Sequence, residues 1–547
     1  MSQYRWLNAE SQKFLSRGYL LPNQSADERV SIICNEAERR LGIDGFAARL
    51  KHVIERGWIS LSTPIWTNFA HPTRGLPISC YGSHIEDNME SILGTLSEVG
   101  IMTKHGGGTS AYFGKLRGRG ALIQDNGKSF GSVHFMQLYE TVIKVVSQGT
   151  TRRGSFAAYL PIDHPDIMEF LQIKGTDSPL QEIFPGVVVS DDFMERVKAK
   201  DHQALVVWAA VVNSRKKRGL PYIVFEGNVQ RGAPECYQAS SIRHSNLCTE
   251  IFLPDGADES FVCDLLSLNM RYWHEWKDTD VVEIATFLLD AVMSEFIDKS
   301  ADIPDLHRAR RFAIRHRALG IGWLGWHTLL QEQMIPFDSF DAKLLNVLIA
   351  QTVKRDAYAA STKLGTMLGV PDAAKGTGRR NTTLLAIAPT QSSAFILGQV
   401  SEGIEPILSN YYVTEKAKVV ETIKNKTLTA YLKLIDKNTQ EVWDSIGVNR
   451  GSVQHLDFLQ DDVKAVFKTR LEIGPKEVII QAAQRQKYID QGQSTNLLIH
   501  PSVPAKDINA LLIFAWEQGI KSLYYQHSVN ASQELSRSIL ECESCSA

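Results

Sequence analysis

The chain alternates short, β-branched apolar runs with long amphipathic stretches, and this alternation constrains its fold most. Runs such as Gly186 to Ser190 and Tyr222 to Phe225 have the length of buried strands, whereas Val281 to Lys299 and Ala342 to Leu364 have helical spacing. Repeated β/α units of this kind predict a largely parallel, buried sheet covered by helices. Because the 547 residues contain no internal repeat and no low-complexity linker, one large barrel-like α/β domain is favoured over several small domains.

The two ends of the chain suggest its domain organisation. Ser25 to Glu28 is a capping-box signature, and Gly42 supplies a left-handed stop after the periodic apolar residues. The last β/α unit is a predicted helix over Asp507 to Gln518 followed by a strand over Ile520 to Tyr525. The predicted organisation is an N-terminal helical region over residues 1–75, a barrel over 76–528 and a flexible tail over 529–547.

Charge and composition exclude several classes of protein. With 59 Lys and Arg against 61 Asp and Glu, the net charge of −2 argues against a nucleic-acid binder that depends on overall positive charge. The longest apolar run, Ala204 to Val212, is too short for the roughly 20 residues of a membrane helix, and no signal peptide opens the sequence. Seven unevenly spaced cysteines favour a reducing compartment, so we expect a cytoplasmic protein that binds neither membranes nor nucleic acids.

Two further motifs carry no function on their own. Gly106 to Gly108 followed by Gly114-Lys115 resembles a phosphate loop, but the spacing is one residue too long, and Leu116 stands where Ser or Thr would bind magnesium. A tight turn that brings the backbone close to a ligand remains open. The basic run from Arg215 to Arg218 is interpreted as a solvated loop rather than a nucleic-acid patch.

Three cysteine segments provide the strongest chemical signal. In an extended segment, Asn246, Cys248 and Glu250 would point to the same side and converge on one ligand. A buried cysteine beside a solvated glutamate fits this pentapeptide as well. Cys80 and Cys263 each lie in a short apolar context typical of a strand, as expected for thiols that line an interior.

A further pair of thiols, Cys542 and Cys545, forms a C-x-x-C motif in the Ser/Glu-rich C-terminal segment. A lone C-x-x-C lacks the second pair of ligands that a structural zinc site needs, so no metal site is predicted in this chain. A flexible dithiol suits the transfer of reducing equivalents, because thiol–disulfide exchange requires close approach of the sulfurs.

In chain order, these motifs resemble the large catalytic subunit of class I ribonucleotide reductases. The match runs from Ser62-Thr63-Pro64 through the cysteine segments and the Tyr524-Tyr525 pair to the tail C-x-x-C. Pro389 to Ser393 is similar to the family's substrate-phosphate loop, and the segment from Glu402 to Pro406 also matches the family's pattern. Each motif is weak alone, but their order is highly specific.

The resemblance implies a ten-stranded α/β barrel with a central finger loop that carries Cys248. The implied reaction is the reduction of ribonucleoside diphosphates to 2′-deoxyribonucleoside diphosphates, which supplies DNA precursors. By similarity, Cys248 becomes a thiyl radical that abstracts the ribose 3′ hydrogen, Glu250 acts as general base, and Asn246 orients the substrate hydroxyls. Cys80 and Cys263 would supply two electrons and become a disulfide.

Other roles also follow from the resemblance. Cys542 and Cys545 would reduce that disulfide, and Tyr525 and then Tyr524 would carry the radical to Cys248. Because neighbours on a regular strand point to opposite faces, we expect extended geometry to fail near Tyr524, with the two rings close together. The implied substrate-binding residues are Thr63, Ser79, Gly106, Gly107, Asn246, Pro389, Thr390, Gln391, Ser392 and Ser393. The implied effector-binding residues are Asp87, Arg152 and Arg153, although solvated surface charges fit nearly as well.

Partners are implied in the same way. The radical would come from a metal-containing, ferritin-like small subunit, and thioredoxin or glutaredoxin would reduce the tail. A dNTP or ATP would act as specificity effector on a nucleotide-promoted homodimer, and no cofactor is implied in the chain itself. Because only about sixty residues precede the match, we expect no N-terminal ATP-cone. Compact forms of this kind resemble virus-encoded members, for which the location would be the host cytoplasm.

Two alternatives stay open. A cobalamin-dependent reductase shares the barrel and the thiyl chemistry but needs no small subunit, and the adjacent Tyr524-Tyr525 pair favours the class I interpretation. A catalytically silent barrel that only binds nucleotides belongs to a different functional class. The five cysteines that match the family's redox-active positions disfavour a catalytically silent protein.

Overall fold

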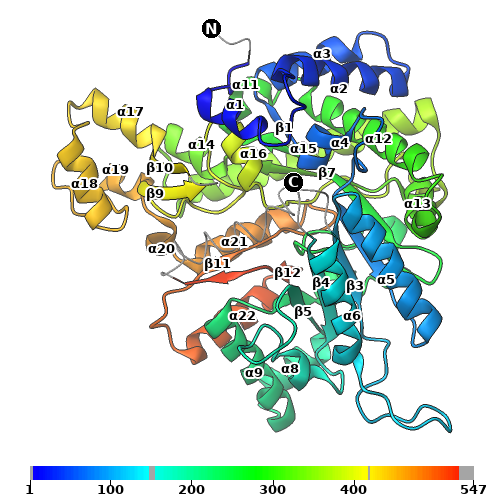
Figure 1. The fold of residues 1–547 in the computed structure, drawn as a ribbon. Coiled ribbons are helices and arrows are strands. Elements are labelled where there is room, and N and C mark those ends of the chain that lie inside the picture. The colour runs from blue at the N-terminus through cyan, green and yellow to red at the C-terminus, as the bar shows by residue number, and fades with distance from the viewer. Residues whose placement is uncertain (1–3, 147–153, 417–418, 529–547) are drawn as a thin grey trace.

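The structure, a computed structural model, describes residues 4–146, 154–416 and 419–528 (Figure 1). Its centre is a sheet that curls into a barrel. One half of the barrel consists of five parallel strands: β2 (Cys80–His84), β3 (Gly108–Tyr112), β4 (Phe156–Pro161), β5 (Ile183–Val189) and β6 (Tyr222–Phe225). These strands are buried along almost their whole length, as expected for a parallel sheet covered on both faces.

The second half of the barrel runs antiparallel to the first. Its five parallel segments are β7 (Phe261–Asn269), β8 (Leu319–Leu324), residues 385–387, residues 491–495 and β12 (Ser522–Leu523). β11 (Leu497–Leu498) and β13 (Gln526–His527) extend the last pairing. β7 pairs with β2 at one seam and β12 pairs with β6 at the other, so ten segments close the ring. The predicted α/β barrel is confirmed.

Helices cover the outside of the barrel. The two predicted amphipathic stretches are α12 (Val281–Lys299) and α15 (Phe340–Leu368). The interpretation of Arg215 to Arg218 as a loop is wrong, because this run is the last turn of α9 (His202–Arg218), where cations face the negative end of the helix dipole. None of the described helices is long and apolar enough to span a membrane. Other barrel helices are α5 (Met89–Lys104), α6 (Ser132–Val145), α7 (Ile167–Phe170), α8 (Asp191–Lys198), α10 (Glu226–Arg231), α11 (Trp273–Trp276), α13 (His307–His316), α14 (Trp326–Glu332), α16 (Gln391–Ile396), α20 (Arg470–Ile473), α21 (Pro475–Gln486) and α22 (Ala505–Glu517).

The N-terminal region contains α1 (Ala9–Leu15), α2 (Ala26–Leu41) and α3 (Phe46–Glu55), drawn in blue in Figure 1. The predicted capping box of α2 is present, and the helix ends at Gly42 in the left-handed conformation. The region is not purely helical, because β1 (Ile59–Leu61) pairs antiparallel with β7 and joins the barrel sheet. The predicted limits of the region and the barrel stay predictions.

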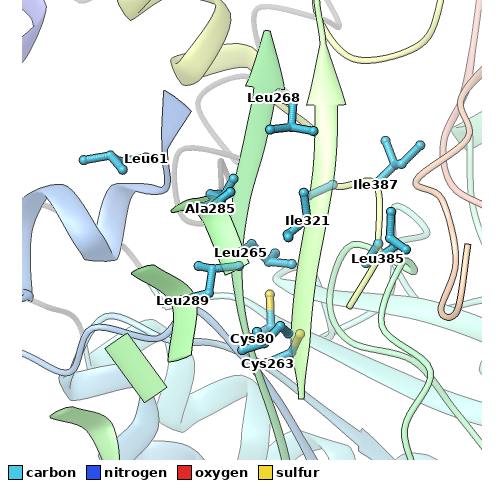
Figure 2. Close-up of a cluster of buried hydrophobic side chains, with 14 of the residues drawn as sticks. Leu61, Cys80, Cys263, Leu265, Leu268, Ala285, Leu289, Ile321, Leu385 and Ile387 are labelled. Atoms are coloured by element: carbon cyan, nitrogen blue, oxygen red, sulfur yellow. The ribbon is translucent and has the colours of Figure 1, made fainter. Parts of the chain in front are cut away.

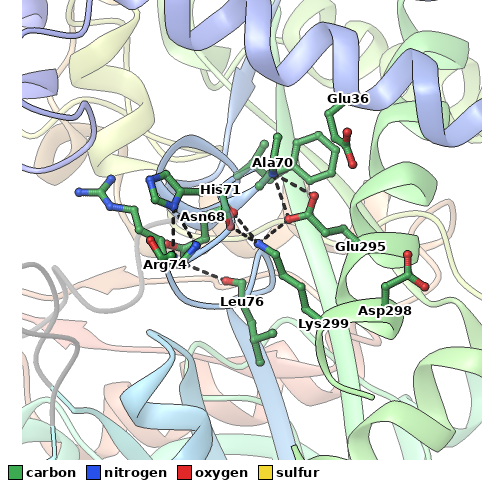
Figure 3. Close-up of polar contacts among 12 residues, drawn as sticks. Glu36, Asn68, Ala70, His71, Arg74, Leu76, Glu295, Asp298 and Lys299 are labelled. Carbon is green, nitrogen blue, oxygen red and sulfur yellow. Dashed lines mark hydrogen bonds and ion pairs between the residues drawn. The ribbon is translucent and has the colours of Figure 1, made fainter. Parts of the chain in front are cut away.

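A polar network fixes the segment that leads from α4 (Thr63–Asn68) to β2 (Figure 3). Glu295 of α12 accepts the N–H of Ala70 at 2.9 Å, and Lys299 donates to the carbonyls of Asn68 and His71 at 3.0 and 2.8 Å. Glu295 and Lys299 also form an ion pair at 2.7 Å. This clamp sets the path of the chain shortly before β2 begins.

A small lobe packs beside the barrel and is drawn in yellow and orange at the left of Figure 1. It consists of the hairpin β9 (Tyr411–Lys416) and β10 (Val419–Lys424) with α17 (Lys426–Leu434), α18 (Gln440–Val448) and α19 (Asp461–Val466). The lobe has its own hydrophobic core, which includes Trp443 and Phe467. It forms one wall of the cavity described below.

Candidate active site

A loop without regular secondary structure, residues 243–253, crosses the interior of the barrel between α10 and β7. Residues 244–253 are buried, and donors from both halves of the barrel bind the loop carbonyls at 2.6 to 2.8 Å. These donors are Ser110 and Tyr159 from the first half and Gly492, Ser494 and Ser522 from the second. The loop is the finger loop expected from the resemblance.

The tip of the finger loop is a turn, so the prediction of an extended segment over Asn246, Cys248 and Glu250 is wrong. The N–H of Thr249 donates to the carbonyl of Asn246, and Thr249 has a φ of 65°. A positive φ is unusual for a β-branched residue and persists only where the surroundings fix the backbone. The hydrogen bonds to the carbonyls of Cys248 and Thr249 provide that restraint. Asn246 and Glu250 converge through this turn instead of along one strand face.

The Glu250 carboxylate is buried and held by three side chains. Asn246 donates to it at 2.9 Å, Ser494 at 3.0 Å, and the Cys80 thiol lies 3.9 Å away. The Asn246 side-chain oxygen in turn accepts the N–H groups of Glu250 and Ile251 at 3.1 Å. Burial raises the pKa of Glu250 to about 7, although these hydrogen bonds favour the charged form. A carboxylate with such a pKa can accept or return a proton near neutral pH.

The thiols of Cys80 and Cys263 lie side by side across the seam between β2 and β7 (Figure 2). The two residues are direct partners in the antiparallel register, where Cα atoms are about 4.5 to 5.5 Å apart, within the range that a disulfide bridges. Burial raises the pKa of the Cys263 thiol, so it stays protonated, and Gln491 contacts its sulfur at 3.5 Å.

The tyrosine pair has the geometry expected from the sequence. β12 ends at Leu523, so the predicted strand over Ile520 to Tyr525 is too long, and regular strand pairing is interrupted at Tyr524 and Tyr525. The ring centroids of Tyr524 and Tyr525 lie 4.3 Å apart. The Tyr524 hydroxyl lies 3.7 Å from the Cys248 sulfur. The structure therefore brings the end of the last barrel strand to the tip of the finger loop.

A cavity of about 910 Å³ opens between the barrel and the lobe. Its walls include Pro389, Thr390, Gln391 and the segment from Ser401 to Ser409, and they reach Ser494, Tyr524 and Tyr525. Ser392 and Ser393 do not line it and lie in the first turn of α16. Asn246, Glu250, Cys80, Cys248 and Cys263 do not line it either. Two residues of the wall contact this group, because Ser494 donates to Glu250 and the Tyr524 hydroxyl lies 3.7 Å from the Cys248 sulfur.

The other predicted substrate residues lie at the start of β2 and β3 or before them. Gly106 and Gly107 lead into β3, whose first N–H donates to the carbonyl of Ser79 at 2.7 Å. A Cβ at Gly107 would lie 2.4 Å from the Tyr81 ring, so only glycine fits there. Thr63 is buried at the start of α4, 3.1 Å from the hydroxyl of Tyr19.

Several predicted residues have other surroundings or lie outside the described part of the chain. Asp87 forms an ion pair with Arg117 at 2.6 Å, which gives it a structural partner. Arg152, Arg153, Cys542 and Cys545 fall outside the described residues. The sequence reasoning missed Tyr159, Gln491 and Ser494, which all form hydrogen bonds with the finger loop, because a lone tyrosine, glutamine or serine carries no motif.

Comparison with known proteins agrees with this geometry. A family model described as the ribonucleotide reductase barrel domain matches residues 78–207, 200–374 and 369–526. A putative ribonucleoside-diphosphate reductase large subunit of Frog virus 3 (isolate Goorha) is 33% identical, over 91% of this chain and 92% of its own length. The ribonucleoside-diphosphate reductase large subunit of Invertebrate iridescent virus 3 is 31% identical, with 88% of each chain covered. The solved Actinobacillus ureae class Id ribonucleotide reductase alpha subunit is 49% identical with a TM-score of 0.92, covering 97% of this chain and 99% of that one.

Proposed function

The chain belongs to the ribonucleotide reductase family, and on that premise we propose that it reduces ribonucleoside diphosphates to 2′-deoxyribonucleoside diphosphates by thiyl-radical chemistry. It acts as the large subunit of a class I enzyme, and a separate small subunit supplies the oxidising equivalent. The observation that carries the proposal is the Tyr524 hydroxyl, 3.7 Å from the sulfur of Cys248 at the tip of the finger loop. The roles assigned below to single residues are part of this proposal.

Cys248 is the residue that starts the reaction. Oxidation reaches it through Tyr525 and then Tyr524, whose rings are in contact. A tyrosyl radical at Tyr524 takes the hydrogen atom from the Cys248 thiol, which regenerates the phenol and leaves a thiyl radical. The thiyl radical then takes the 3′ hydrogen of the ribose and becomes a thiol again. The short distance between the Tyr524 oxygen and the sulfur supports this transfer.

Glu250 acts as the base for the 3′ hydroxyl, and Asn246 orients the sugar. Their mutual hydrogen bond at 2.9 Å fixes the carboxylate, and Ser494 holds its other oxygen. Because burial raises the pKa of Glu250 to about 7, the group can take the proton and later return it at neutral pH.

Cys80 and Cys263 are the reductant of the substrate. Each turnover replaces the 2′ hydroxyl by hydrogen and releases the oxygen as water, so it consumes two protons and two electrons. Two thiols that close to one disulfide supply both. Their direct pairing across the antiparallel seam supports this role, because the bond can close without moving the backbone.

The cavity beside Tyr524 is the proposed substrate site. Pro389, Thr390 and Gln391 line it, and N–H groups and hydroxyls in such a turn suit a diphosphate without a large positive charge. Ser392 and Ser393 complete the proposed phosphate loop, and Thr63, Ser79, Gly106 and Gly107 complete the substrate contacts. The ribose must then reach past Ser494 toward Glu250, which requires a small movement of the wall.

The remaining partners are proposals by family likeness. Cys542 and Cys545 reduce the disulfide and are themselves reduced by thioredoxin or glutaredoxin. A dNTP or ATP acts as specificity effector on a homodimer, with Asp87, Arg152 and Arg153 among its contacts. The working location is the cytoplasm, where thiol reductants are available. The family relationship to class I subunits does not favour the cobalamin-dependent enzyme or the silent barrel.

Turnover of CDP tests the proposed function. Dithiothreitol replaces the protein reductant, and the chain is assayed alone, with adenosylcobalamin, and with a candidate ferritin-like small subunit. We expect dCDP only in the presence of the small subunit. Formation of dCDP with adenosylcobalamin alone would contradict the class I assignment, and no dCDP under any condition would contradict the reaction.

A further inference from the structure

Arg215, in the basic run at the end of α9, is a buried cation that the proposed chemistry does not use. Its side chain is 0% exposed and points toward the tyrosine pair rather than toward solvent. Nη1 donates to the carbonyl of Pro221 and, at 3.1 Å, to the carbonyl of Tyr524. Pro221 directly precedes β6, so one guanidinium joins the start of β6 to the residue whose hydroxyl faces Cys248.

A second contact joins the same two segments. The carbonyl of Gly219 accepts the N–H of Gln526 at 3.0 Å. Gly219 has a φ of 76°, and a Cβ there would lie 2.7 Å from the carbonyl oxygen of Gln526, so only glycine fits. The turn from α9 to β6 and the segment after β12 are therefore tied together on both sides of Tyr525.

This tie places a third tyrosine ring against the pair. The ring centroid of Tyr222, the first residue of β6, lies 4.8 Å from that of Tyr524 and 5.2 Å from that of Tyr525. Phe184 packs on Tyr222 and on the edge of Tyr525, at 6.2 and 6.3 Å. The two Tyr222 distances are close to the 4.3 Å between Tyr524 and Tyr525 themselves, so the position of β6 sets the position of both rings.

Packing alone does not account for a charge at this position. Among the described residues, no carboxylate forms an ion pair with Arg215, and its Nε and Nη2 atoms have no hydrogen-bond partner. Burial lowers the pKa of the guanidinium to about 9, which still leaves it protonated at neutral pH. A buried cation without a counter-ion is costly, whereas a neutral side chain could fill the same space.

A positive charge next to the relay has a direct chemical consequence. Oxidation of a tyrosine without loss of its proton leaves a cation, and two positive charges repel strongly in a medium of low dielectric constant. The Arg215 charge therefore disfavours electron transfer alone and favours the joint transfer of a proton and an electron. That is the form in which Tyr524 must exchange a hydrogen atom with Cys248.

We propose that Arg215 is a positioning residue of the radical relay, which holds the backbone of Tyr524 and the start of β6 so that the rings of Tyr222, Tyr524 and Tyr525 stay in contact. It also keeps Tyr524 oxidation coupled to proton transfer. Arg215 itself gains and loses no electron. The inference rests on the proposed function and deepens it.

The test compares Arg215→Met with Lys217→Met in the full chain with its small subunit. Lys217 lies in the same helical turn but is exposed, so its removal changes the charge of the turn without touching the relay. The readouts are kcat and KM for CDP, the affinity for CDP, and the yield of radical at position 524 in protein that carries 3-aminotyrosine there. The aminotyrosyl radical is measured by electron paramagnetic resonance.

We expect Arg215→Met to lower kcat by at least about 100-fold, because a displacement of about 1 Å at reacting groups has an effect of that size. The affinity for CDP should stay within about threefold, the radical yield at position 524 should fall with kcat, and Lys217→Met should match the unsubstituted protein. Arg215→Lys keeps the charge and one donor and should recover part of the turnover.

An Arg215→Met variant that turns over like Lys217→Met would overturn the inference. A parallel loss of CDP affinity would do the same, because it would indicate general disruption. If Arg215→Met does not fold, Arg215→Lys decides: kcat equal to that of Lys217→Met contradicts a positioning role. Absence of dCDP with the unsubstituted protein would instead contradict the proposed function.

Discussion

The three buried thiols of the candidate site, Cys80, Cys248 and Cys263, occupy two kinds of backbone. Cys80 and Cys263 lie on regular strands and face each other across an antiparallel seam. Cys248 lies on an irregular loop whose next residue, Thr249, has a positive φ. The thiol pair depends on a fixed distance, and a strand register supplies it. The single thiol must instead reach the centre of the barrel and meet Tyr524, which no strand of the barrel wall could do.

This difference separates two requirements of one reaction. The seam is stable in itself, because its hydrogen bonds and apolar side chains belong to the barrel core, as Figure 2 shows for Leu265, Leu268 and Ile321. The finger loop is not part of a strand ladder. Its backbone carbonyls instead accept hydrogen bonds from side chains such as Ser494 and Ser522. Substitutions in the two regions should therefore have different consequences, which the following predictions use.

The largest effect is expected at the tip of the finger loop. Cys248→Ser should reduce CDP turnover to background, since a serine hydroxyl does not form the equivalent radical under these conditions. Binding of CDP and of the small subunit should not change. Cys34→Ala in α2 is the matched control, because Cys34 is a buried cysteine far from the loop in sequence and should only lower stability, by about 1 kcal/mol. Measurable steady turnover by Cys248→Ser would contradict the assignment.

On the strand seam, Cys80→Ser or Cys263→Ser should abolish multiple turnover while leaving nucleotide binding near normal. One thiol cannot supply both electrons and form the disulfide, so the catalyst is not regenerated. Product is counted per enzyme molecule with dithiothreitol in excess. Sustained turnover by either variant would mean that the seam is not the reductant.

Glu250 lies next to the tip of the finger loop and also contacts the Cys80 thiol of the seam. Its pKa of about 7 should affect kcat and the free energy of unfolding in opposite directions as the pH rises. The base acts as a carboxylate, which predominates above the pKa, so kcat should rise between about pH 6 and pH 8. Stability should change the other way. The folded pKa is raised above the ordinary 4.5, so this contribution is present below pH 4.5 and is lost as the pH rises through about 7, and it amounts to about 3 kcal/mol.

Glu250→Gln should lower kcat by about 10² to 10⁴-fold and should remove this part of the pH dependence of unfolding. Urea unfolding at pH 5 and pH 8 measures the second effect in both proteins. A flat kcat profile in the unsubstituted protein, or identical pH dependence of unfolding in the variant, would show that Glu250 does not titrate in this range.

The smallest effect on turnover is expected when threonine is replaced by glycine, a substitution that can be made in both kinds of backbone. Thr249→Gly removes a side chain from a left-handed position, so relief of about 1 kcal/mol should offset most of the lost packing, while kcat falls about tenfold because the tip is less fixed. Thr109→Gly on β3 is the matched change on a regular strand, where Thr109 is 0% exposed and donates to the carbonyl of Ser155. We expect it to cost about 2 to 4 kcal/mol. Equal losses of stability in denaturant unfolding would contradict the distinction between the finger loop and a regular strand.

Regular elements could be predicted from the sequence. The spacing of apolar residues and the caps predicted α2 and α12, and β-branched runs predicted β5 and β6, because these signals are local. The contact between the Tyr524 and Tyr525 rings was predicted from the resemblance, because a direct relay requires neighbouring rings to meet.

Contacts between distant segments could not be predicted from the sequence. The turn at Thr249 depends on donors about 245 and 273 residues away, and the burial of Arg215 depends on Tyr524, 309 residues away. For the same reason, β1 was missed in a region that otherwise has helical spacing.

The central claim is that a radical passes from Tyr524 to Cys248, and CDP turnover by Tyr524→Phe tests it most directly. Phenylalanine keeps the ring and its packing but lacks the hydroxyl that lies 3.7 Å from the Cys248 sulfur. Tyr139→Phe, which removes a buried hydroxyl bonded to the carbonyl of Ile92 in α5, is the control. The account predicts that Tyr524→Phe folds, binds CDP and binds the small subunit, yet forms dCDP only at background, while Tyr139→Phe keeps its turnover. Turnover by Tyr524→Phe close to that of the unsubstituted protein would contradict the account.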